Sequence, residues 1–414
     1  MRKLFTFSAA AMVALSAAAD DVSVLWSGVP NQFMATGLSA DNNYVCGTSS
    51  IWNVKSGETV MAEDPNVFLS DVSNTGVAVG NAGDYAISMN ANGETTYIEG
   101  MDFVNYSTAL GISADGSIIT GSRFDADYHQ EACYWENGVH HTLPLPEVYE
   151  DMPDDIEVYG VSACGISEDG NVIIGNIITG TASEAVVMWT RNESGDYEFH
   201  PLYAGFMEFG WEEVKPYIHM SAQNVSTNGK WISLVLQLNS WEDFSYYAGR
   251  YNTETGEVEC GGKISAYTEG DYYATGISDN GTTVGFIEQQ EMTIYGRQSF
   301  VWKVSSENTE LLSNYCEGNT EIENLEKGES LVYTGISGDG EHIIGYSMKN
   351  GIEDMDSFMI NLNGDLSGIN SVVTESKGGV DGIYNLQGSR VTGEPTPGIY
   401  IVIENGKSKK VMVK

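Results

Sequence analysis

The sequence predicts an all-β protein: a seven-bladed β-propeller followed by a small C-terminal β module. Three observations predict this fold. A short motif built on Gly-Ile-Ser recurs seven times, each copy carries turn and strand signals, and a second strand pair follows most copies. A period of this size indicates one supersecondary unit per copy, and such units stack because none buries its apolar face alone. The copies are aligned on the serines Ser39, Ser73, Ser113, Ser167, Ser226, Ser278 and Ser337.

The first half of each unit has the pattern of a strand, a tight turn and a second strand. In YYATGISDNGTTVGF, residues 272–286, Asn-Gly stands at the turn, and Asp-Gly or Asn-Gly recurs in other copies. These residues tolerate the positive φ of tight hairpins, and the serine hydroxyl can bond backbone groups where the turn begins. The Gly that ends the motif, as at Gly121 and Gly285, indicates a bulge or a close backbone approach. The fifth copy is divergent, because it has Leu234 and Val235 in place of that Gly.

A second half follows most copies. Segments such as EACYWENGVHHTL and QSFVWKVSSENTELL contain an apolar strand, a polar turn and a further strand. Two hairpins make a four-stranded unit, and seven such units favour a propeller, whose radial closure leaves few exposed edges. The last copy supplies three clear strands, at 331–336, 342–347 and 357–361. Residues 22–26 alternate apolar and polar side chains, so we expect them to complete the last blade and close the ring.

The chain is expected to divide into three parts. Residues 1–19 combine a basic start, an apolar run and an Ala-x-Ala ending, the pattern of a secretory signal peptide. The propeller is assigned to residues 20–366 and the C-terminal β module to residues 367–414. The protein is therefore predicted to be exported, to the extracellular medium, the outer cell surface or the periplasm.

Charge and composition exclude several classes of partner. The chain has 414 residues and a formal net charge of −39. Such an acidic surface repels phosphate backbones, so nucleic acid is not expected as a partner. After the signal peptide no segment has about 18 consecutive apolar residues, so membrane insertion is not expected. The five cysteines are scattered and odd in number, which does not fit a disulfide framework.

Two stretches resemble known families. The Gly-Ile-Ser-x-Asp-Gly-x-x-Ile-x-Gly units resemble the HAF-type extracellular repeats of bacterial secreted proteins, over roughly residues 30–362. This resemblance implies a propeller-like structure. The C-terminal segment resembles the C-terminal sorting domain of the type IX secretion system in Bacteroidetes. It shares an Ile-Tyr-Asn-Leu-Gln-Gly strand and turn, a Gly-Ile-Tyr-Ile-Val strand and a Lys-rich final strand. The alternative is a small accessory β module that stays on the mature protein.

No catalytic or metal motif is present in the sequence. There are six histidines, no serine lies in a Gly-x-Ser-x-Gly elbow, and the repeated serines belong to turns. We therefore assign no catalytic residue, no cofactor and no metal ligand. Ca²⁺ is kept as a candidate ion, since Asp125, Asp127, His129 and Glu131 would share one face of an extended strand. The alternative for these four residues is a solvated loop.

The candidate binding residues lie in two long insertions around the divergent fifth unit, residues 203–220 and 239–247. Both are rich in aromatic and acidic residues, which suit carbohydrate or peptide contacts if the two loops share a face. The alternative is that the aromatic side chains pack between blades. The ligand-binding candidates are Trp211, Glu212, Tyr217, Trp241, Asp243, Tyr246 and Tyr247.

Together these observations predict a secreted or cell-surface propeller that is a non-catalytic binding module for a glycan or protein ligand. The alternative is a polysaccharide-acting hydrolase or lyase that uses carboxylates and aromatic side chains of the propeller funnel. A purely structural envelope component is also left open.

Overall fold

The computed structural model divides the chain into two compact units, Met1–Leu366 and Ser367–Lys414. The residues that the structure describes are 22–28, 33–99, 106–125, 129–146, 158–179, 184–204, 217–238, 245–289, 296–304, 306–327, 330–348 and 355–362 in the larger unit. In the smaller unit they are 382–384, 398–404 and 407–413.

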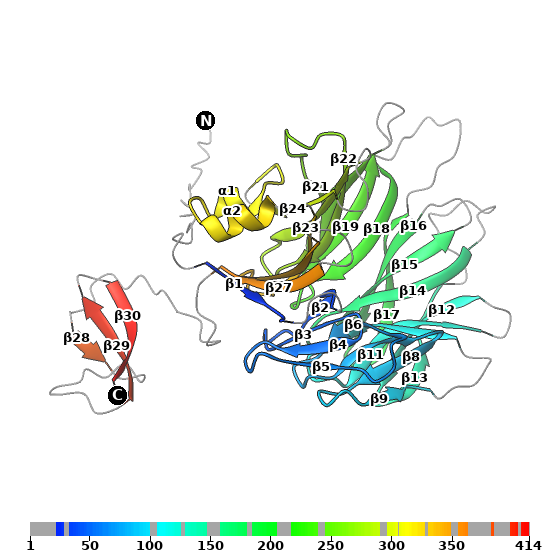
Figure 1. Ribbon diagram of the computed structural model, residues 1–414. Coiled ribbons are helices and arrows are strands. Elements are labelled where there is room, and N and C mark those ends of the chain that lie inside the picture. The colour runs from blue at the N-terminus through cyan, green and yellow to red at the C-terminus, as the bar shows by residue number, and fades with distance from the viewer. Residues whose placement is uncertain are drawn as a thin grey trace, which may run out of the picture. The chain divides into compact units, whose positions relative to one another are not determined.

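The larger unit is built from successive antiparallel sheets, which we number in chain order (Figure 1). Sheet 1 contains β2 (Gly37–Leu38), β3 (Tyr44–Gly47), β4 (Ser50–Asn53) and β5 (Glu58–Met61). Sheet 2 contains β6 (Val67–Val72), β7 (Ala78–Ala82), β8 (Tyr85–Met89) and β9 (Thr95–Tyr97). Sheet 3 contains β10 (Ser107–Ile112), β11 (Ile118–Phe124), β12 (Gln130–Glu136) and β13 (Val139–Thr142). Sheet 4 contains β14 (Val158–Ile166), β15 (Val172–Thr179), β16 (Glu184–Arg191) and β17 (Tyr197–Ala204).

The remaining sheets follow the same order. Sheet 5 contains β18 (Tyr217–Val225), β19 (Trp231–Leu238), β20 (Tyr246–Asn252) and β21 (Val258–Cys260). Sheet 6 contains β22 (Gly270–Ile277), β23 (Thr283–Gln289) and β24 (Arg297–Trp302). Sheet 7 contains β25 (Leu331–Ile336), β26 (His342–Met348), β27 (Met355–Asn361) and β1 (Ser23–Trp26). One parallel pairing, Gln130 with Gly160, links sheets 3 and 4. This succession of sheets is a β-propeller arrangement.

Sheet 6 departs from the predicted four strands. After β24 the described chain forms two isolated bridges, a parallel one between Gly262 and Asn308 and an antiparallel one between Val301 and Glu310. The chain then forms two short helices, α1 (Leu312–Tyr315) and α2 (Thr320–Glu326). The Asn319 side chain caps α2 by accepting the amides of Glu321 and Ile322. The fourth strand expected within QSFVWKVSSENTELL is therefore wrong, because the chain becomes helical after two isolated bridges.

The N-terminal strand pairs where the sequence predicts. β1 lies antiparallel to β27, with Val24 opposite Ile360 and Trp26 opposite Phe358. Val22 packs in the apolar cluster that joins sheets 6 and 7. The first and last sheets also share hydrogen bonds: the Ser357 hydroxyl accepts from the amide of Ala35 at 3.0 Å and donates to the carbonyl of Phe33.

The repeated serine has a structural role, as the sequence predicts. The Ser113 hydroxyl accepts the amide of Ile118 at 3.0 Å and donates to the Asp115 carboxylate at 2.8 Å. Turns of neighbouring sheets are also joined, since the amide of Ala114 donates to the carbonyl of Glu168 at 3.0 Å. Ser39, Ser167, Ser226 and Ser337 repeat the hydroxyl pattern of Ser113. The motif therefore closes each turn and connects it to the next.

The Gly that ends the motif allows a close backbone approach. A Cβ on Gly285 would overlap the carbonyl oxygen of Tyr273, and the Phe300 ring lies over the same Gly. In sheet 5 the small and the large residue of this cross-strand pair are exchanged. Leu234 stands at the Gly position on β19, and Gly249 lies opposite it on β20. A Cβ on Gly249 would lie 3.1 Å from the Cβ of Leu234. The divergent unit therefore keeps its packing by exchanging the small and the large residue.

A cavity of about 210 Å³ lies where the innermost strands meet. Residues of β2, β6, β10, β14, β18, β22 and β25, one strand from each sheet, line it. The smaller unit is a separate antiparallel sheet of β28 (Gly382–Tyr384), β29 (Gly398–Glu404) and β30 (Lys407–Val413).

Candidate ligand-binding surface

Four of the predicted site residues, Trp211, Glu212, Trp241 and Asp243, lie outside the described residues. The structure does describe the strand ends that flank these four residues. Tyr217, the first residue of β18, pairs directly with Leu238, the last residue of β19. Segments 205–216 and 239–244 therefore join the sheet at neighbouring strand ends.

Tyr246 and Tyr247 begin β20 and have different surroundings, because consecutive strand residues point to opposite faces. Tyr247 is partly buried against the apolar cluster between sheets 4 and 5, and the ammonium of Lys263 lies 4.4 Å from its ring centroid. Tyr246 instead contacts His219 and Tyr273, with ring centroids 5.5 and 5.9 Å away. For Tyr247 the structure shows the inter-sheet packing that was the alternative interpretation.

Tyr246 belongs to a continuous row of side chains that we call the aromatic column: His219, Tyr246, Tyr273, Phe286 and Arg297. Tyr273 and Phe286 are stacked at 5.0 Å with an interplanar angle of 20°. The Arg297 guanidinium lies over the Phe286 ring, 5.0 Å from its centroid. All five side chains are half-buried. The aromatic column therefore crosses sheet 6 from its outer to its inner strand and continues onto sheet 5.

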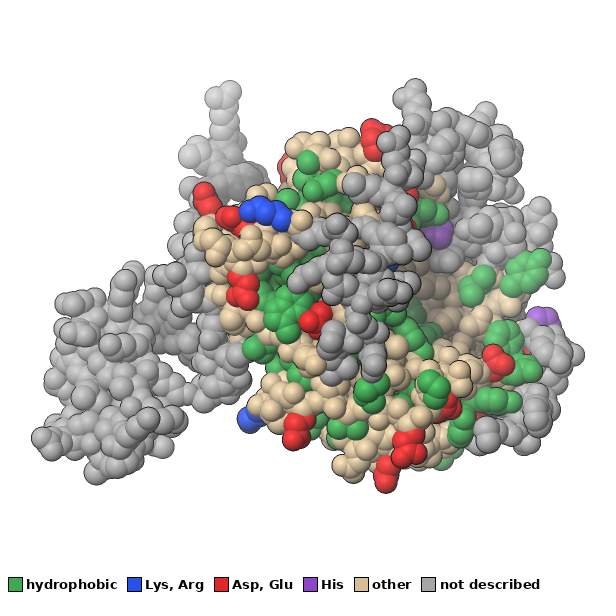
Figure 2. Space-filling view, viewed as in Figure 1, with side chains coloured by type: hydrophobic (Ala, Val, Ile, Leu, Met, Phe, Trp, Pro, Cys, Tyr) green, Lys and Arg blue, Asp and Glu red, His purple; other side chains and the backbone are tan. Residues whose placement is uncertain are grey.

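Carboxylates flank the aromatic column. Arg297 donates to Glu288 at 3.1 Å, and Asp271 accepts the backbone amide of Tyr246 at 2.9 Å. Burial, together with the nearby Asp271 and Glu288, raises the pKa of Tyr273 to about 12. The phenol is thus neutral at physiological pH. Figure 2 shows acidic side chains spread over the described surface and few basic ones, in keeping with the net charge of −39.

Sequence reasoning missed four members of this column: His219, Tyr273, Phe286 and Arg297. Tyr273 and Phe286 lie inside the Gly-Ile-Ser unit at residues 272–286, which was interpreted only as a structural repeat. A signal was available, because the repeat has aromatic residues at both of these positions only in its sixth copy. Their meeting with Tyr246 depends on strand register and on the order of the sheets.

The candidate cation site does not form as one extended face. Asp125 and His129 enclose the turn between β11 and β12, where the amide of His129 donates to the Asp125 carboxylate at 2.8 Å. Glu131 lies on β12, and Asp127 is outside the described residues. The extended arrangement is therefore wrong, because the chain reverses direction between Asp125 and His129. Among the described residues, no group of three or more His, Cys, Asp or Glu side chains is placed to hold a metal ion.

A polar cluster lies between sheets 2 and 3. Glu99 accepts the indole N–H of Trp135 at 2.7 Å, and its second carboxylate oxygen is buried without a hydrogen-bond partner in the described structure. The Nε2 atom of His140, whose ring contacts Trp135, is likewise buried and unpaired. Burial lowers the pKa of His140, so the imidazole is neutral at physiological pH. Glu99 and His140 therefore both lie against Trp135, and the Arg123 guanidinium lies 3.8 Å from the Glu99 carboxylate.

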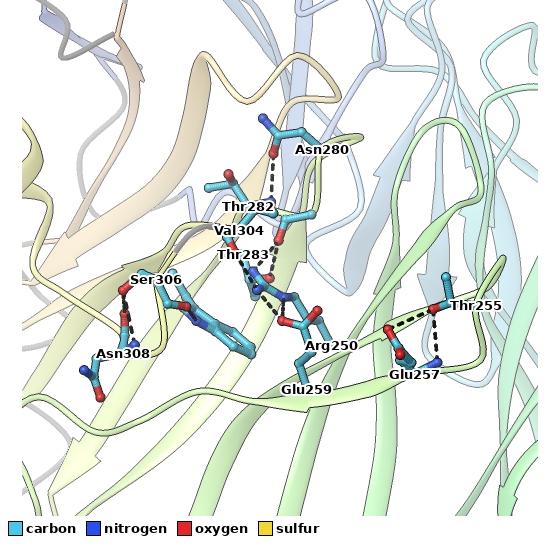
Figure 3. Close-up of polar contacts among 12 residues, drawn as sticks. Arg250, Thr255, Glu257, Glu259, Asn280, Thr282, Thr283, Val304, Ser306 and Asn308 are labelled. Atoms are coloured by element: carbon cyan, nitrogen blue, oxygen red, sulfur yellow. Dashed lines mark hydrogen bonds and ion pairs between the residues drawn. The ribbon is translucent and has the colours of Figure 1, made fainter. Parts of the chain in front are cut away.

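A buried arginine joins sheets 5 and 6 (Figure 3). Arg250 on β20 is 1% exposed and lies over the Trp302 ring, 3.9 Å from its centroid. Its guanidinium donates to Glu259 and to the carbonyl oxygens of Gly281 and Val304. Because these contacts engage all three guanidinium nitrogens, the role of Arg250 is structural.

Two of the cysteines, Cys260 and Cys316, are poor nucleophiles. All five lie in the described part of the chain, and no disulfide joins them. Burial raises the pKa of Cys260 and of Cys316 to about 11, so neither is a thiolate at neutral pH.

Comparisons with known proteins give structural likenesses only. No protein-family profile matches the sequence. No curated protein matches it either. Three solved structures with similar folds are TolB from Acinetobacter baumannii, an oligogalacturonate lyase in complex with manganese, and the Dos1 propeller.

The identities to these three structures are 12%, 10% and 11%, and the TM-scores are 0.40, 0.48 and 0.45. The matches cover 67%, 84% and 83% of this chain, and 61%, 92% and 95% of the respective structures. The chain thus spans less than two thirds of the TolB structure. In the described part of the chain, no helix is long and apolar enough to cross a membrane.

Proposed function

We propose that this protein is an exported seven-bladed β-propeller that acts as a non-catalytic binding module for a glycan or protein ligand. The observation that carries this proposal is the aromatic column, which lies at the same strand ends as the two aromatic-rich insertions. On sheet 5, Tyr246 of β20 pairs with Gln237 of β19, and Gln237 pairs with His219 of β18. The two column residues of this sheet therefore stand in one row across its strands. Half-buried aromatic side chains with polar neighbours are common in ligand contacts.

Seven blades and a closed ring are part of the proposal. The central cavity is lined by one inner strand from each of the seven sheets, and β1 pairs with β27. Export is proposed from the signal-peptide pattern of residues 1–19. The smaller unit is proposed as an accessory β module, and its resemblance to a type IX sorting domain and the HAF-type resemblance of the repeats remain predictions.

The binding role is tested with glycan and peptide arrays probed with the purified protein. A ligand whose binding weakens when Tyr246 is replaced by Ala supports the proposal. No ligand on either array, together with turnover in an activity screen, contradicts it. Localisation is tested separately, by fractionating cells of the source bacterium and probing each fraction with an antibody.

The runner-up function, a polysaccharide-acting hydrolase or lyase, has one observation in its favour. Glu99 and His140 each keep a buried polar atom without a hydrogen-bond partner in the described structure, and a carboxylate beside a neutral imidazole can transfer protons. Activity on a polysaccharide panel that is lost in Glu99→Gln and His140→Gln would favour this function. Unchanged turnover in both variants would remove these residues from the mechanism.

A further inference from the structure

The aromatic column offers ring edges, not ring faces, at its centre. Phe286 contacts the Tyr273 ring from β22 and the Arg297 guanidinium from β24, the two strands that flank its own strand β23. Tyr273 lies between Phe286 and the tilted ring of Tyr246. Sugar rings bind aromatic side chains by stacking on a free face. Each of the two central rings already has two aromatic or guanidinium neighbours, so these rings are poorly suited to that mode of binding.

The edges of the column carry groups that suit a polypeptide. Within the described structure the hydroxyls of Tyr246 and Tyr273 form no hydrogen bond, and tyrosine and arginine are enriched where proteins bind one another. Glu288 lies beside the column with 43% of its side chain exposed; its Oε1 accepts from Arg297, and its second carboxylate oxygen has no hydrogen bond within the described structure. The surface therefore combines rigid aromatic edges, phenol donors and an exposed carboxylate.

The composition of the column is specific to sheet 6. Tyr273 stands five residues before the repeat serine, and the other sheets carry different residues at that position. These are Met34, Phe68, Thr108, Ser162, Ser221 and Val332. A feature that every sheet shares serves the fold, as the repeated serine does. A feature that one sheet alone carries is free to serve recognition.

The negative charge of this protein favours a basic polypeptide over an acidic one. The net charge is −39, and Asp271 and Glu288 flank the column, whose one arginine, Arg297, is already paired with Glu288. An acidic partner would be repelled, while a basic segment would be attracted and its encounter accelerated. We infer that the ligand of the aromatic column is a polypeptide segment containing Lys or Arg, which packs across the ring edges and places its cations near Glu288. This inference rests on the proposed binding function and narrows it.

The test uses a phage-displayed random peptide library and a glycan array, each probed with the purified protein. We expect enrichment of Lys- and Arg-containing peptides. Their affinity should fall about tenfold or more in Tyr273→Ala and in Tyr246→Ala, as for residues that anchor an interface, and should also fall with added salt. Circular dichroism checks that both variants fold.

The matched control is Phe68→Ala. Phe68 occupies the same repeat position on sheet 2 and is 40% exposed, so its loss should leave peptide affinity unchanged. Glycan binding that Tyr273→Ala abolishes, without peptide binding, would overturn this inference and leave the proposed binding function intact. Peptides that bind both tyrosine variants as well as wild type would also overturn it. No ligand of either kind would defeat the proposed function itself.

Discussion

Arg250 should be a major stabilising contact between sheets 5 and 6. Replacing it with Ala removes the ion pair to Glu259, the hydrogen bonds to the carbonyls of Gly281 and Val304, and the contact with the Trp302 ring. The Gly281 carbonyl is in a buried residue, so it loses a donor that water does not readily replace.

The expected loss in the free energy of unfolding can be estimated from these contacts. A hydrogen bond to a charged group contributes about 1.5–3 kcal/mol, and the stacking of Arg250 on Trp302 about 0.5–2 kcal/mol. Glu259 is 41% exposed and returns to water, which offsets part of the loss. We therefore expect Arg250→Ala to lower the free energy of unfolding by about 3–5 kcal/mol. For a unit of this size that corresponds to a fall in melting temperature of about 4–7 °C.

The assay is urea unfolding followed by tryptophan fluorescence, because the Arg250 guanidinium lies 5.7 Å from the Trp231 ring centroid and 3.9 Å from that of Trp302. Arg250→Lys should recover only part of the loss, since one ammonium cannot reproduce the planar fork. Lys230→Ala is the control. Its partner Glu254 and Lys230 itself are largely exposed, so the change should cost less than about 1 kcal/mol.

Two results would refute this reasoning. One is an Arg250→Ala protein with the wild-type urea midpoint, which would show that the sheets are joined without this contact. The other is full recovery by Arg250→Lys, which would mean that charge alone, and not the fork geometry, holds the sheets together.

Three further predictions concern closure, packing and pH. Deleting residues 20–28 removes β1, and the larger unit should lose structure cooperatively on heating at a lower temperature; an unchanged melting temperature contradicts closure by β1. Gly249→Ala should destabilise by about 1–3 kcal/mol, because the added Cβ meets Leu234 and Leu236; the urea midpoint measures this, and no change would show that sheet 5 relaxes freely. Burial raises the pKa of Asp71 to about 7, so the folded protein holds this proton more tightly than the unfolded chain. The contribution of Asp71 to stability should fall as the pH rises from about 4 to 7, and Asp71→Asn should remove that dependence in melting curves taken across this range. A slope that Asp71→Asn leaves unchanged would assign the pH dependence to other groups.

The substitution Asp71→Asn has a precedent within the chain. Asn224 stands at the same repeat position in sheet 5, and its side chain accepts the amide of Val225 at 2.7 Å. Asp71 accepts the amides of Val72 and Ile112. An amide side chain therefore fits this position, so loss of folding is not the expected result.

Much of the fold could be predicted from the sequence. The Asp-Gly and Asn-Gly turns, the serine that bonds across each turn and the β-branched strands are local signals, because the residues that interact lie within about six positions of one another. The pairing of β1 with β27 could be predicted from a count of strands. The three-stranded form of sheet 6 could not be predicted, because the stretch after Trp302 has a strand pattern but forms two isolated bridges before Leu312 begins a helix.

The candidate site, unlike the fold, could be predicted from the sequence only in small part. The sequence directed attention to the divergent fifth unit, and Tyr246 there does face the aromatic column. The rest of the column comes from β18, β22, β23 and β24.

The sequence by itself determined the repeating unit of this protein, its turns and the order of its strands, because these depend on local backbone preferences and on the alternation of apolar residues. Only the tertiary structure decided which side chains meet. Strand register places Tyr273 beside Phe286, and the succession of sheets brings Tyr246 to the same row. Contacts between residues that are distant in sequence leave no periodic signal, so the surface proposed for binding emerged only when the sheets were assembled.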